Sequence, residues 1–448
     1  MSAPPRRLGL IPAASPLDAV VRPPGSKSET NRALVCAALA PGTSVVDGVL
    51  HADDTAAMVD CLRGLGAVIR SEEQDHAAVD TGRLVVEGVA GRPHPVAATL
   101  DARLSGTTAR FVTPVASLGP AQVTVDGAPG LVARPMDDLI DALVELGAGV
   151  RELGAAGRLP LRVGDPPLRG GAVSLRGDVS SQFLSGLLLA APCTPEGVEV
   201  TLTSELVSVP YVELTVSVMR RFGAEVEGDP ASGYRVAPTG YRATEVEVEP
   251  DATAATYLMA APLLAGGRVR VLGIGTRTRQ GDAAFAEVLA RMGASVEQGP
   301  DWTEVASTGG LRGIDVDLSD TSDTAQTLAV VAAVASGTTT VRGIGFIRGK
   351  ETDRIAAVVT ELTRLGVEAE ERPDGFTVHG GRPRGGVVRT YGDHRMAMSF
   401  ALLGLRVPGV VIEDPDCVDK TFPGYFGVLD RLTHGSQVVG DDRPWPDT

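Results

Sequence analysis

The sequence predicts an α/β (α+β) protein of two domains, each built from three repeated β/α units whose buried helices are faced by sheets. Three observations support this prediction. A chain of 448 residues exceeds what one hydrophobic core usually supports. Two kinds of helical phrase recur along the whole chain. Short valine-rich segments, broken by Gly and Pro, lie between the helical phrases, as is typical of strands.

The first repeated element is an amphipathic helix followed by a glycine and a β-rich run. It reads CLRGLGAVI, ALVELGAGV, VMRRFGAEV, VLARMGASV and ELTRLGVEA, and a looser copy, FGVLDRL, lies near Phe426. A glycine ends a helix at this place because it adopts the left-handed conformation without strain. These glycines, which are about 70 to 80 residues apart, are Gly66, Gly147, Gly223, Gly293 and Gly366.

The second repeated element is an alanine-rich apolar helix that follows a small or acidic residue. Ser, Thr and Asp at such a start are typical helix N-caps. Because these helices are apolar on nearly every side, we expect them to be buried together in two bundles. The run VEVEPDATAA, from Val246, opens the fourth unit and marks the domain boundary, and the polar tail after His434 is expected to be disordered. The six helices begin near Lys27, Ser105, Ser180, Asp251, Ser322 and Gly392.

The composition argues against several classes of binding partner and site. The net charge of -15 argues against a general affinity for nucleic acid or for anionic membranes. No run of 18 uncharged apolar residues and no secretory signal are visible. The four cysteines form no CxxC pair, which favours isolated thiols over disulfides or a zinc site. We therefore expect a cytoplasmic protein.

Lysine usage is unusual. Lys and Arg total 41, yet lysine occurs only at Lys27, Lys350 and Lys420. A codon bias explains the excess of arginine without reference to function. Lysine differs from arginine in being a compact charge whose pKa can be tuned. We therefore expect these three positions to be ones where arginine does not serve.

Several predicted helix N-termini in the first half of the chain have candidate anion-binding residues in addition to the N-cap. Free N–H groups and a partial positive charge make a helix N-terminus suited to anions. The segment GSKSETNR resembles a phosphate cradle but lacks P-loop spacing, so it is weak evidence for a nucleotide site. Each of these starts, taken alone, is also explained by plain capping. The candidate residues are Lys27, Ser28, Arg32, Gly106, Thr107, Arg110, Arg134, Ser180, Ser181 and Gln182.

The fifth and sixth units carry a denser set of charges. The segment KETDR, taken alone, is equally well explained as a solvated surface. GDHR is harder to explain in that way because it runs directly into the apolar helix MAMSFALLG, and KETDR places Glu351 and Arg354 one turn apart on an expected helix. The candidate residues are Asp323, Lys350, Glu351, Asp353, Arg354, Asp393, His394, Arg395 and Lys420.

Together these residues indicate acid–base group transfer on small, multiply anionic substrates. Five cations (Lys27, Arg134, Arg354, Arg395 and Lys420) can clamp phosphate and carboxylate groups. Asp323 and Glu351 are available for proton transfer. The chain shows no nucleophile elbow, no HExxH and no GxGxxG after a clear strand, so we expect no cofactor and no metal.

These motifs, in this order, resemble those of the EPSP synthase family, the 3-phosphoshikimate 1-carboxyvinyltransferases. The motifs are GSKSETNRAL, SGTTARF, DVSSQFLSGLLLAAP, LVSVPY, KETDR, YGDHRMAM and DKTFPGYF, and they span about residues 20 to 430. The resemblance implies an inside-out α/β barrel of the enolpyruvyl transferase type, with two lobes joined by a hinge that close on substrate. It implies an N-terminal lobe at 23–248, mainly for shikimate 3-phosphate. A C-terminal lobe, 1–22 plus 249–448, would hold the acid–base residues and part of the phosphoenolpyruvate clamp.

The resemblance also implies a reaction and roles for individual residues. The family transfers the enolpyruvyl group of phosphoenolpyruvate to the 5-hydroxyl of shikimate 3-phosphate in aromatic amino-acid biosynthesis, through a tetrahedral intermediate. Asp323 would accept the hydroxyl proton, Glu351 would protonate the methylene carbon, and Lys27 would also be catalytic. The implied binders of shikimate 3-phosphate are Lys27, Ser28, Arg32, Ser180, Ser181, Gln182, Ser208, Asp323 and Lys350. The implied clamp for phosphoenolpyruvate is Lys27, Gly106, Arg134, Gln182, Arg354, Arg395 and Lys420. We expect a monomer whose partners are these small molecules.

The sequence departs from the family pattern at three places. Phe346 stands where some members carry Asn, which affects one substrate contact. Ser105 stands where Ala is common, and Phe111 replaces a frequent Pro. The last two positions border the region where glyphosate, the family's inhibitor, binds; because Gly106 is present, we expect sensitivity to it.

Four alternatives stay open. The sister enzyme that uses UDP-N-acetylglucosamine typically has a cysteine-bearing loop, where this chain has DGAPGLVARP, and typically lacks KSxxNRA. An RNA 3′-phosphate cyclase shares part of the fold, but the acidic charge opposes it. A non-catalytic repeat scaffold explains six units but not the placement of the lysines. A paralogue of secondary metabolism with an altered acceptor is compatible with every motif.

Overall fold

The chain folds into two compact units, here called the N-terminal and C-terminal lobes. The computed structural model describes residues 5–72 and 82–433. The N-terminal lobe comprises residues 25–72 and 82–248, and the C-terminal lobe comprises 5–24 and 249–433 of the described residues. The chain therefore crosses from one lobe to the other after Pro24 and after Val248. The tail after His434, where we expected disorder, lies outside the described residues.

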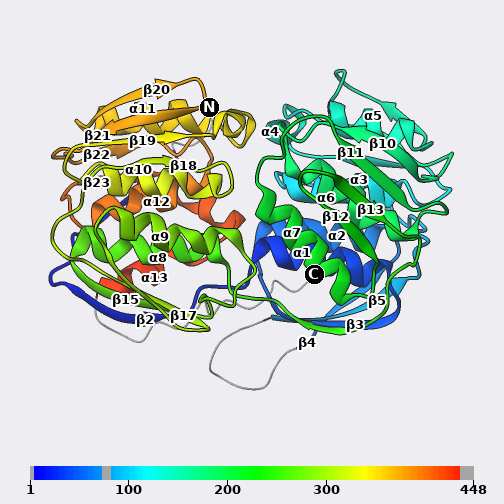
Figure 1. Cartoon of the computed structure of the whole chain (residues 1–448), viewed down its shortest axis with the longest axis horizontal. Helices are drawn as coiled ribbons and strands as arrows, with labels where there is room; N and C mark the ends of the chain where they lie inside the picture. Colours follow the sequence, from blue (N-terminus) through cyan, green and yellow to red (C-terminus); the bar gives the residue numbers. More distant parts are fainter. Residues whose placement is uncertain (1–4, 73–81, 434–448) are drawn as a thin grey trace. The chain divides into compact units, whose positions relative to one another are not determined.

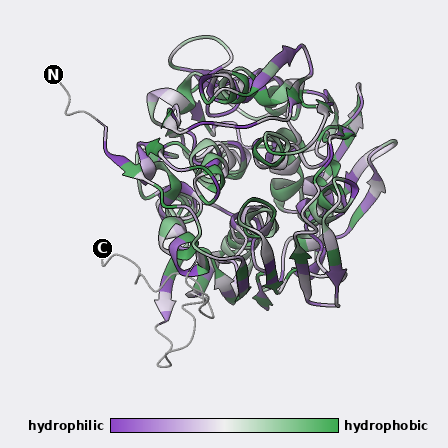
Figure 2. Cartoon of the chain, turned by 90° about the vertical axis from the view of Figure 1, so that its left-hand side faces the viewer, coloured by the Kyte–Doolittle hydropathy of each residue, from purple (hydrophilic) through white to green (hydrophobic). Residues whose placement is uncertain are grey.

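Each lobe is a bundle of buried helices surrounded by sheets, as the repeats predicted (Figure 1). In the N-terminal lobe the three central helices contact one another: α1 (Lys27–Leu39), α3 (Gly106–Ala116) and α6 (Ser181–Ala190). In the C-terminal lobe α8 (Ala252–Ala265), α10 (Ala325–Ala332) and α12 (His394–Gly404) do the same. Helix α8 has no polar face, and every residue from Ala254 to Leu264 is buried. Figure 2 shows hydrophobic residues gathered on the helices of the C-terminal lobe, with polar and apolar residues alternating along the outer strands.

The second kind of helix packs outside these bundles and ends as its glycine predicts. Gly66, Gly147, Gly223, Gly293 and Gly366 all have positive φ, between 82° and 106°. Helix α11 is amphipathic: it buries Ile355, Val358 and Leu362 on one face, at the spacing of a helical stripe. These outer helices are α2 (Asp53–Gly64), α5 (Asp137–Glu145), α7 (Val209–Arg221), α9 (Phe285–Arg291), α11 (Arg354–Arg364) and α13 (Tyr425–Thr433). One-turn pieces are α4 (Pro129–Val132) and the 3₁₀ turns Ala191–Cys193, Gly281–Ala284, Ser322–Thr324, Gly345–Gly349 and Pro415–Lys420.

The three sheets of the N-terminal lobe follow one pattern, a parallel pair and then two antiparallel strands. The first is β14 (Glu245–Glu247), β3 (Pro41–Val49), β5 (Gly82–Val89) and β4 (Val68–Glu72). The second is β6 (Thr99–Asp101), β7 (Val123–Asp126), β9 (Leu161–Val163) and β8 (Val150–Glu152). The third is β10 (Gly171–Leu175), β11 (Val198–Leu202), β13 (Gly233–Val236) and β12 (Val226–Asp229). Strand β14, from the end of the lobe, thus completes the sheet of its first unit.

The C-terminal lobe repeats the pattern twice and shortens it once. Its sheets are β2 (Leu17–Val21), β15 (Gly267–Leu272), β17 (Trp302–Ala306) and β16 (Ser295–Gln298), then β18 (Asp315–Asp317), β19 (Thr338–Arg342), β21 (Gly375–His379) and β20 (Glu368–Arg372). The third has β22 (Gly386–Val388), β23 (Val410–Glu413) and β1 (Arg7–Gly9). Strands β1 and β2 belong to this lobe although they begin the chain, because they complete two of its sheets.

Candidate functional site

The guanidinium of Arg354 is the centre of an ion cluster in the C-terminal lobe. Its side chain is only 2% exposed and contacts three carboxylates. Nε donates to Oδ2 of Asp393 at 2.7 Å, and Nη1 donates to Oδ1 of Asp323 at 2.9 Å. Nη2 donates to Oε2 of Glu351 at 2.7 Å. Arg354 therefore brings together both of the predicted acid–base residues, which precede α10 and α11 of the fifth unit.

Arg395 joins the same cluster from the first turn of α12. Its Nη2 donates to Oδ2 of Asp323 at 2.6 Å, so the two oxygens of Asp323 each accept from a different arginine. Its Nη1 donates to the hydroxyl of Tyr257 at 3.4 Å. Tyr257 lies on α8, and burial raises its pKa to about 12, which keeps the phenol neutral near pH 7.

Lys420 completes the cluster at the end of the 3₁₀ turn Pro415–Lys420. Its Nζ lies 3.5 Å from Oε1 of Glu351. The prediction that Glu351 and Arg354 share a helix face is wrong: Asp353 is the N-cap of α11, and Glu351 lies in the loop before it. The carboxyl of Asp353 accepts from the N–H groups of Ile355 and Ala356, which fixes the start of the helix at Arg354. The contact between Glu351 and Arg354 therefore runs from this loop to the first residue of the helix.

The carboxylates decide the charge state of Arg354. Burial alone lowers the pKa of its guanidinium, because desolvation disfavours the charged form. Asp393, Glu351 and Asp323 more than offset that effect, so the pKa is raised above its ordinary value. The result is a permanent buried cation with carboxylates on three sides, which can hold an anion and sits beside groups that can move protons.

The helix starts of the N-terminal lobe are linked by a chain of side-chain contacts. Lys27, at the start of α1, lies 3.3 Å from Asp54 at the start of α2. The hydroxyl of Thr108 donates to the backbone oxygen of Asp54 at 3.2 Å, which links α2 to α3. Nε2 of Gln182 donates to the hydroxyl of Thr107 at 3.2 Å, which links α3 to α6. The N-terminal ends of these helices therefore gather, and such ends favour anions.

Gly106 faces the polar groups predicted to surround it. A Cβ added at Gly106 would lie 3.2 Å from Nη1 of Arg134, 3.3 Å from Nη1 of Arg110 and 3.8 Å from Oε1 of Gln182. Arg134 and Arg110 are both buried, and Nη1 of Arg110 donates to Oε1 of Gln182 at 2.6 Å. The structure thus brings Gly106, Arg134 and Gln182 together, and any side chain at Gly106 would crowd two guanidinium groups.

Arg32 is buried, with 2% of its surface exposed. It donates to the hydroxyl of Thr215 at 2.7 Å, to the backbone oxygen of Ser28 at 2.9 Å and to that of Tyr211 at 3.0 Å. Its guanidinium also lies 5.1 Å from the centroid of the Phe111 ring. Burial lowers its pKa to about 10, so it stays charged near pH 7. Three of its five N–H groups donate to residues of α1 and α7, which leaves two for another acceptor.

The remaining predicted residues also lie at helix starts or in loops. Ser180 caps α6 by accepting from the N–H of Gln182 at 3.3 Å, and Ser181 is the first residue of that helix. Ser208 precedes α7 in a left-handed conformation with φ of 54°. Nζ of Lys350 lies 6.0 Å from the centroid of the Phe346 ring, within reach of a cation–π contact.

Sequence reasoning named Asp393 and Arg110 as candidates without a specific role, and it did not name Asp54. Asp393 is completely buried and binds Arg354 through Nε and Nη2, at 2.7 and 3.3 Å. Asp54 pairs with Lys27, and Arg110 pairs with Gln182. Asp393 and Arg110 both lie within motifs that the sequence marked, GDHR and TTAR. Their roles depend on contacts between different repeats, which no spacing reveals.

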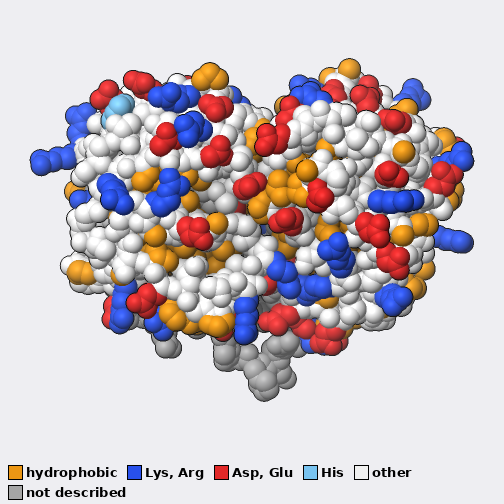
Figure 3. Space-filling view, viewed as in Figure 1, with side chains coloured by type: hydrophobic (Ala, Val, Ile, Leu, Met, Phe, Trp, Pro, Cys, Tyr) orange, Lys and Arg blue, Asp and Glu red, His pale blue; other side chains and the backbone are white. Residues whose placement is uncertain are grey.

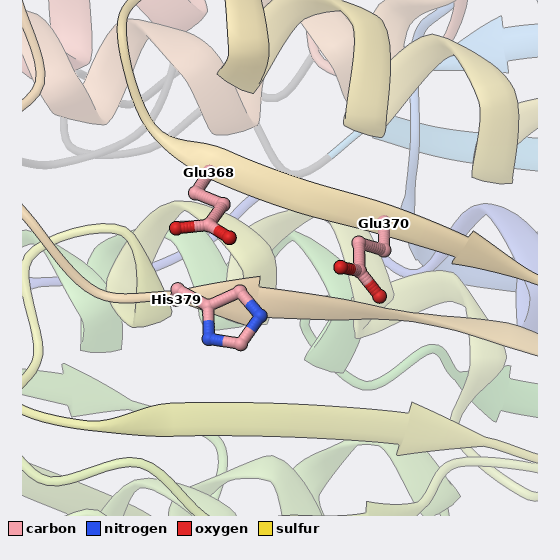
Figure 4. A group of neighbouring side chains, drawn as sticks. All are labelled: Glu368, Glu370 and His379. Atoms are coloured by element: carbon pink, nitrogen blue, oxygen red, sulfur yellow. The ribbon is translucent and has the colours of Figure 1, made fainter.

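Metal-type ligands gather at one place in the described residues, outside these clusters. Glu368 and Glu370 of β20 and His379 of β21 each offer a ligand atom within 4.8 Å of the others (Figure 4). Both glutamates are exposed, and exposed acidic groups are common without an ion, so we assign no metal site to them. The face of the molecule in Figure 3 carries basic and acidic side chains interspersed. In the described part of the chain no helix is both long and apolar enough to cross a membrane.

Comparisons with known proteins agree with the motifs. Residues 11–429 match the family model described as EPSP synthase (3-phosphoshikimate 1-carboxyvinyltransferase). A 3-phosphoshikimate 1-carboxyvinyltransferase of Thiobacillus denitrificans is 43% identical over 428 residues, covering 94% of this chain and 98% of the relative. One of Nostoc punctiforme is 42% identical over 418 residues, covering 93% and 97%. The solved EPSP synthase of Acinetobacter baumannii superposes with a TM-score of 0.78 at 26% identity, covering 95% of this chain and 98% of that one. The chain belongs to the EPSP synthase family.

Proposed function

We propose that this chain transfers the enolpyruvyl group of phosphoenolpyruvate to the 5-hydroxyl of shikimate 3-phosphate, releasing phosphate. Membership of the family supports the reaction. The observation that carries the chemistry is the cluster in which Arg354 contacts Asp323 and Glu351 at 2.9 and 2.7 Å. Two carboxylates held beside buried cations suit a reaction that moves protons while phosphate and carboxylate charges are held.

Asp323 and Glu351 divide the proton transfers of the addition step. Asp323 takes the proton from the 5-hydroxyl as its oxygen attacks C2 of phosphoenolpyruvate. Glu351 gives a proton to the methylene carbon, which becomes a methyl group, and the tetrahedral intermediate forms. In the elimination step the Glu351 carboxylate takes a proton back from the methyl group as the bond from C2 to the phosphate oxygen breaks. Phosphate departs and the enol ether of the product remains.

The cations hold the substrate charges through both steps. The proposed clamp for phosphoenolpyruvate takes Lys27, Gly106, Arg134 and Gln182 from the N-terminal lobe and Arg354, Arg395 and Lys420 from the C-terminal lobe. Arg354, Arg395 and Lys420 contact the carboxylates of Asp323 and Glu351. A bound anion would take over part of these contacts, which leaves the two carboxylates available for proton transfer.

Shikimate 3-phosphate binds mainly at the gathered helix starts of the N-terminal lobe. The free N–H groups and partial positive charge of these starts complement a phosphate. The residues proposed there are Lys27, Ser28, Arg32, Ser180, Ser181, Gln182 and Ser208, with Asp323 and Lys350 added from the C-terminal lobe. A monomeric state and a cytoplasmic location stay predictions.

The decisive experiment measures phosphate release with phosphoenolpyruvate and one of two acceptors. We expect release with shikimate 3-phosphate and none with UDP-N-acetylglucosamine. Release with UDP-N-acetylglucosamine alone would assign the chain to the sister reaction. Release with neither acceptor would contradict the proposed transfer, whatever anions the clusters bind.

A further inference from the structure

The residues before α12 form a strained turn that delivers two charged groups to the Arg354 cluster. Tyr391 and Gly392 both have positive φ, 57° and 67°, and the N–H of Asp393 donates to the backbone oxygen of Thr390 at 2.9 Å. This is the geometry of a type I′ turn, which favours Asn or Gly at its two central positions. A tyrosine in the left-handed region costs about 1–2 kcal/mol, so surrounding contacts must hold it there.

Glu361 supplies the contacts that hold this turn. Its carboxylate is completely buried on α11 and accepts from the hydroxyl of Tyr391 at 2.8 Å and from the N–H of Arg389 at 3.0 Å. Burial and the contact with Glu361 raise the pKa of Tyr391 to about 12, so its hydroxyl stays a donor near pH 7. The side chain of Arg364 donates to Glu361 from the surface at 3.0 Å. One buried carboxylate therefore fixes both the backbone before the turn and the side chain within it.

The turn affects the Arg354 cluster because its last residue, Asp393, belongs to that cluster. The carboxylate of Asp393 receives Nε of Arg354 at 2.7 Å, and it caps α12 by accepting from the N–H of Arg395 at 2.9 Å. Helix α11 thus meets the turn twice, through Arg354 in its first turn and through Glu361 seven residues later. A shift of the turn would move the carboxylate that contacts the side chain of Arg354, and it would also move the backbone of Arg395.

We propose that Glu361 and Tyr391 are positioning residues for the phosphoenolpyruvate clamp, because they hold the Thr390–Asp393 turn from which Asp393 orients Arg354 and Arg395. Neither residue touches the reacting atoms in this proposal. The proposal rests on the proposed function for its kinetic readout, but the geometry of the turn can be tested without it.

The kinetic test compares Tyr391→Phe and Glu361→Gln with the unchanged chain. Tyr391 is 42% exposed, so removing its hydroxyl should leave the protein folded. We expect KM for phosphoenolpyruvate to rise severalfold in Tyr391→Phe and roughly tenfold in Glu361→Gln, because hydrogen bonds to a buried charge are lost. KM for shikimate 3-phosphate should change less than twofold, because most of its proposed ligands lie in the N-terminal lobe.

Two matched controls separate positioning from stability. Tyr241→Phe removes a buried hydroxyl that donates to the backbone oxygen of Leu189 at 2.8 Å in the N-terminal lobe. It should lower the melting temperature and leave KM for phosphoenolpyruvate unchanged. Arg364→Gln removes the surface partner of Glu361 without touching the turn, and it should have little effect on either substrate.

Hydrogen exchange of the backbone amides at Arg389 and Asp393 provides the readout that needs no activity. Faster exchange in both variants, confined to this turn, together with the selective rise in KM, would support the proposal. Unchanged exchange would overturn it, even if the chain proved inactive as a transferase. A fall in stability with KM for phosphoenolpyruvate unaltered, measured where the variant is folded, would overturn it and leave the proposed function standing.

Discussion

The three lysines lie where a small charge has a close partner. Lys27 is 3.3 Å from Asp54, and Lys420 is 3.5 Å from Glu351. Lys350 lies against the ring of Phe346. Both of the lysines with carboxylate partners have little exposed side chain, 14% for Lys27 and 8% for Lys420, and a guanidinium fork is wider than an ammonium group. That these positions require lysine rather than arginine stays a prediction.

Lys27→Arg tests this constraint. The variant keeps the charge, but its fork is larger and its pKa cannot be tuned, so we expect kcat to fall by roughly 10²-fold or more. Steady-state phosphate release measures the loss, and an unchanged melting temperature would show that the fold is intact. Near-normal turnover would reject a special role for lysine at this position.

Glu351→Gln tests the assigned proton donor. The amide is nearly the same size and can still accept from Arg354 through its oxygen, so both substrates should bind with little change. Turnover should fall by roughly 10²- to 10⁴-fold, the usual loss when a general acid is removed. Equilibrium binding and rate are measured together.

The matched control for that variant is Glu87→Gln, which breaks only an exposed ion pair with Arg70 at 3.2 Å. It should leave both binding and rate unchanged. If Glu351→Gln turned over as fast as this control, the assignment of Glu351 would be wrong.

At the scale of helices and strands, the sequence was most informative about where helices end and least informative about where one of them starts. The five glycines after the outer helices all adopt positive φ, as a C-terminal glycine requires. The sequence placed Glu351 on the helix, but α11 begins only at Arg354, after the N-cap Asp353. Asp353 is the N-cap because its carboxyl accepts hydrogen bonds from two backbone N–H groups, at 3.1 and 3.0 Å.

Gly147→Ala tests the helix-ending glycines. A Cβ at this position would meet only the Cβ of Arg169 at 3.4 Å, so the cost should come from φ of 86°. We expect the free energy of unfolding to fall by about 1–2 kcal/mol, measured by urea denaturation. Gly310→Ala, where nothing lies within 4 Å and φ is not positive, is the control and should change stability little. Equal stability of the two variants would contradict the account of how these helices end.

At the scale of the whole molecule, the burial of cysteine thiols and tyrosine phenols makes the stability of the fold depend on pH. Burial raises the pKa of the Cys61, Cys193 and Cys417 thiols to about 12, from an ordinary value of 9.0. Burial likewise raises the pKa of Tyr234 and Tyr257 from 10.0 to about 12. The folded chain therefore holds these protons more tightly than the unfolded chain does.

Alkaline destabilisation follows from these shifts. The contribution of the raised groups is fully present below the unfolded pKa of the thiols and is lost as pH rises from about 9 towards 12. We expect the urea midpoint to be flat between pH 7 and 8 and to fall steadily above pH 9. Replacing Cys61 by Ala should reduce the slope, although its packing loss lowers the midpoint throughout. A midpoint that stayed constant to pH 10.5 would contradict the burial of these groups.

The sequence by itself determined the class of fold, the six units, the buried and outer helices and the family. These features depend on local sequence patterns, namely apolar periodicity, helix caps and glycines that act within a few residues. Local chemistry also marked the charged helix starts, so it named Asp323, Glu351, Arg354 and Arg395 as candidates.

Only the tertiary structure decided which charges meet. Arg354 contacts Asp323 from 31 positions away and Asp393 from 39, and Glu361 reaches Tyr391 from 30. Strands β1 and β2 leave the start of the chain to complete sheets formed by its second half. Such partners are selected by the desolvation of buried charge and by the edges that each sheet leaves open. Both depend on how whole repeats pack, a quantity that no local run of residues contains.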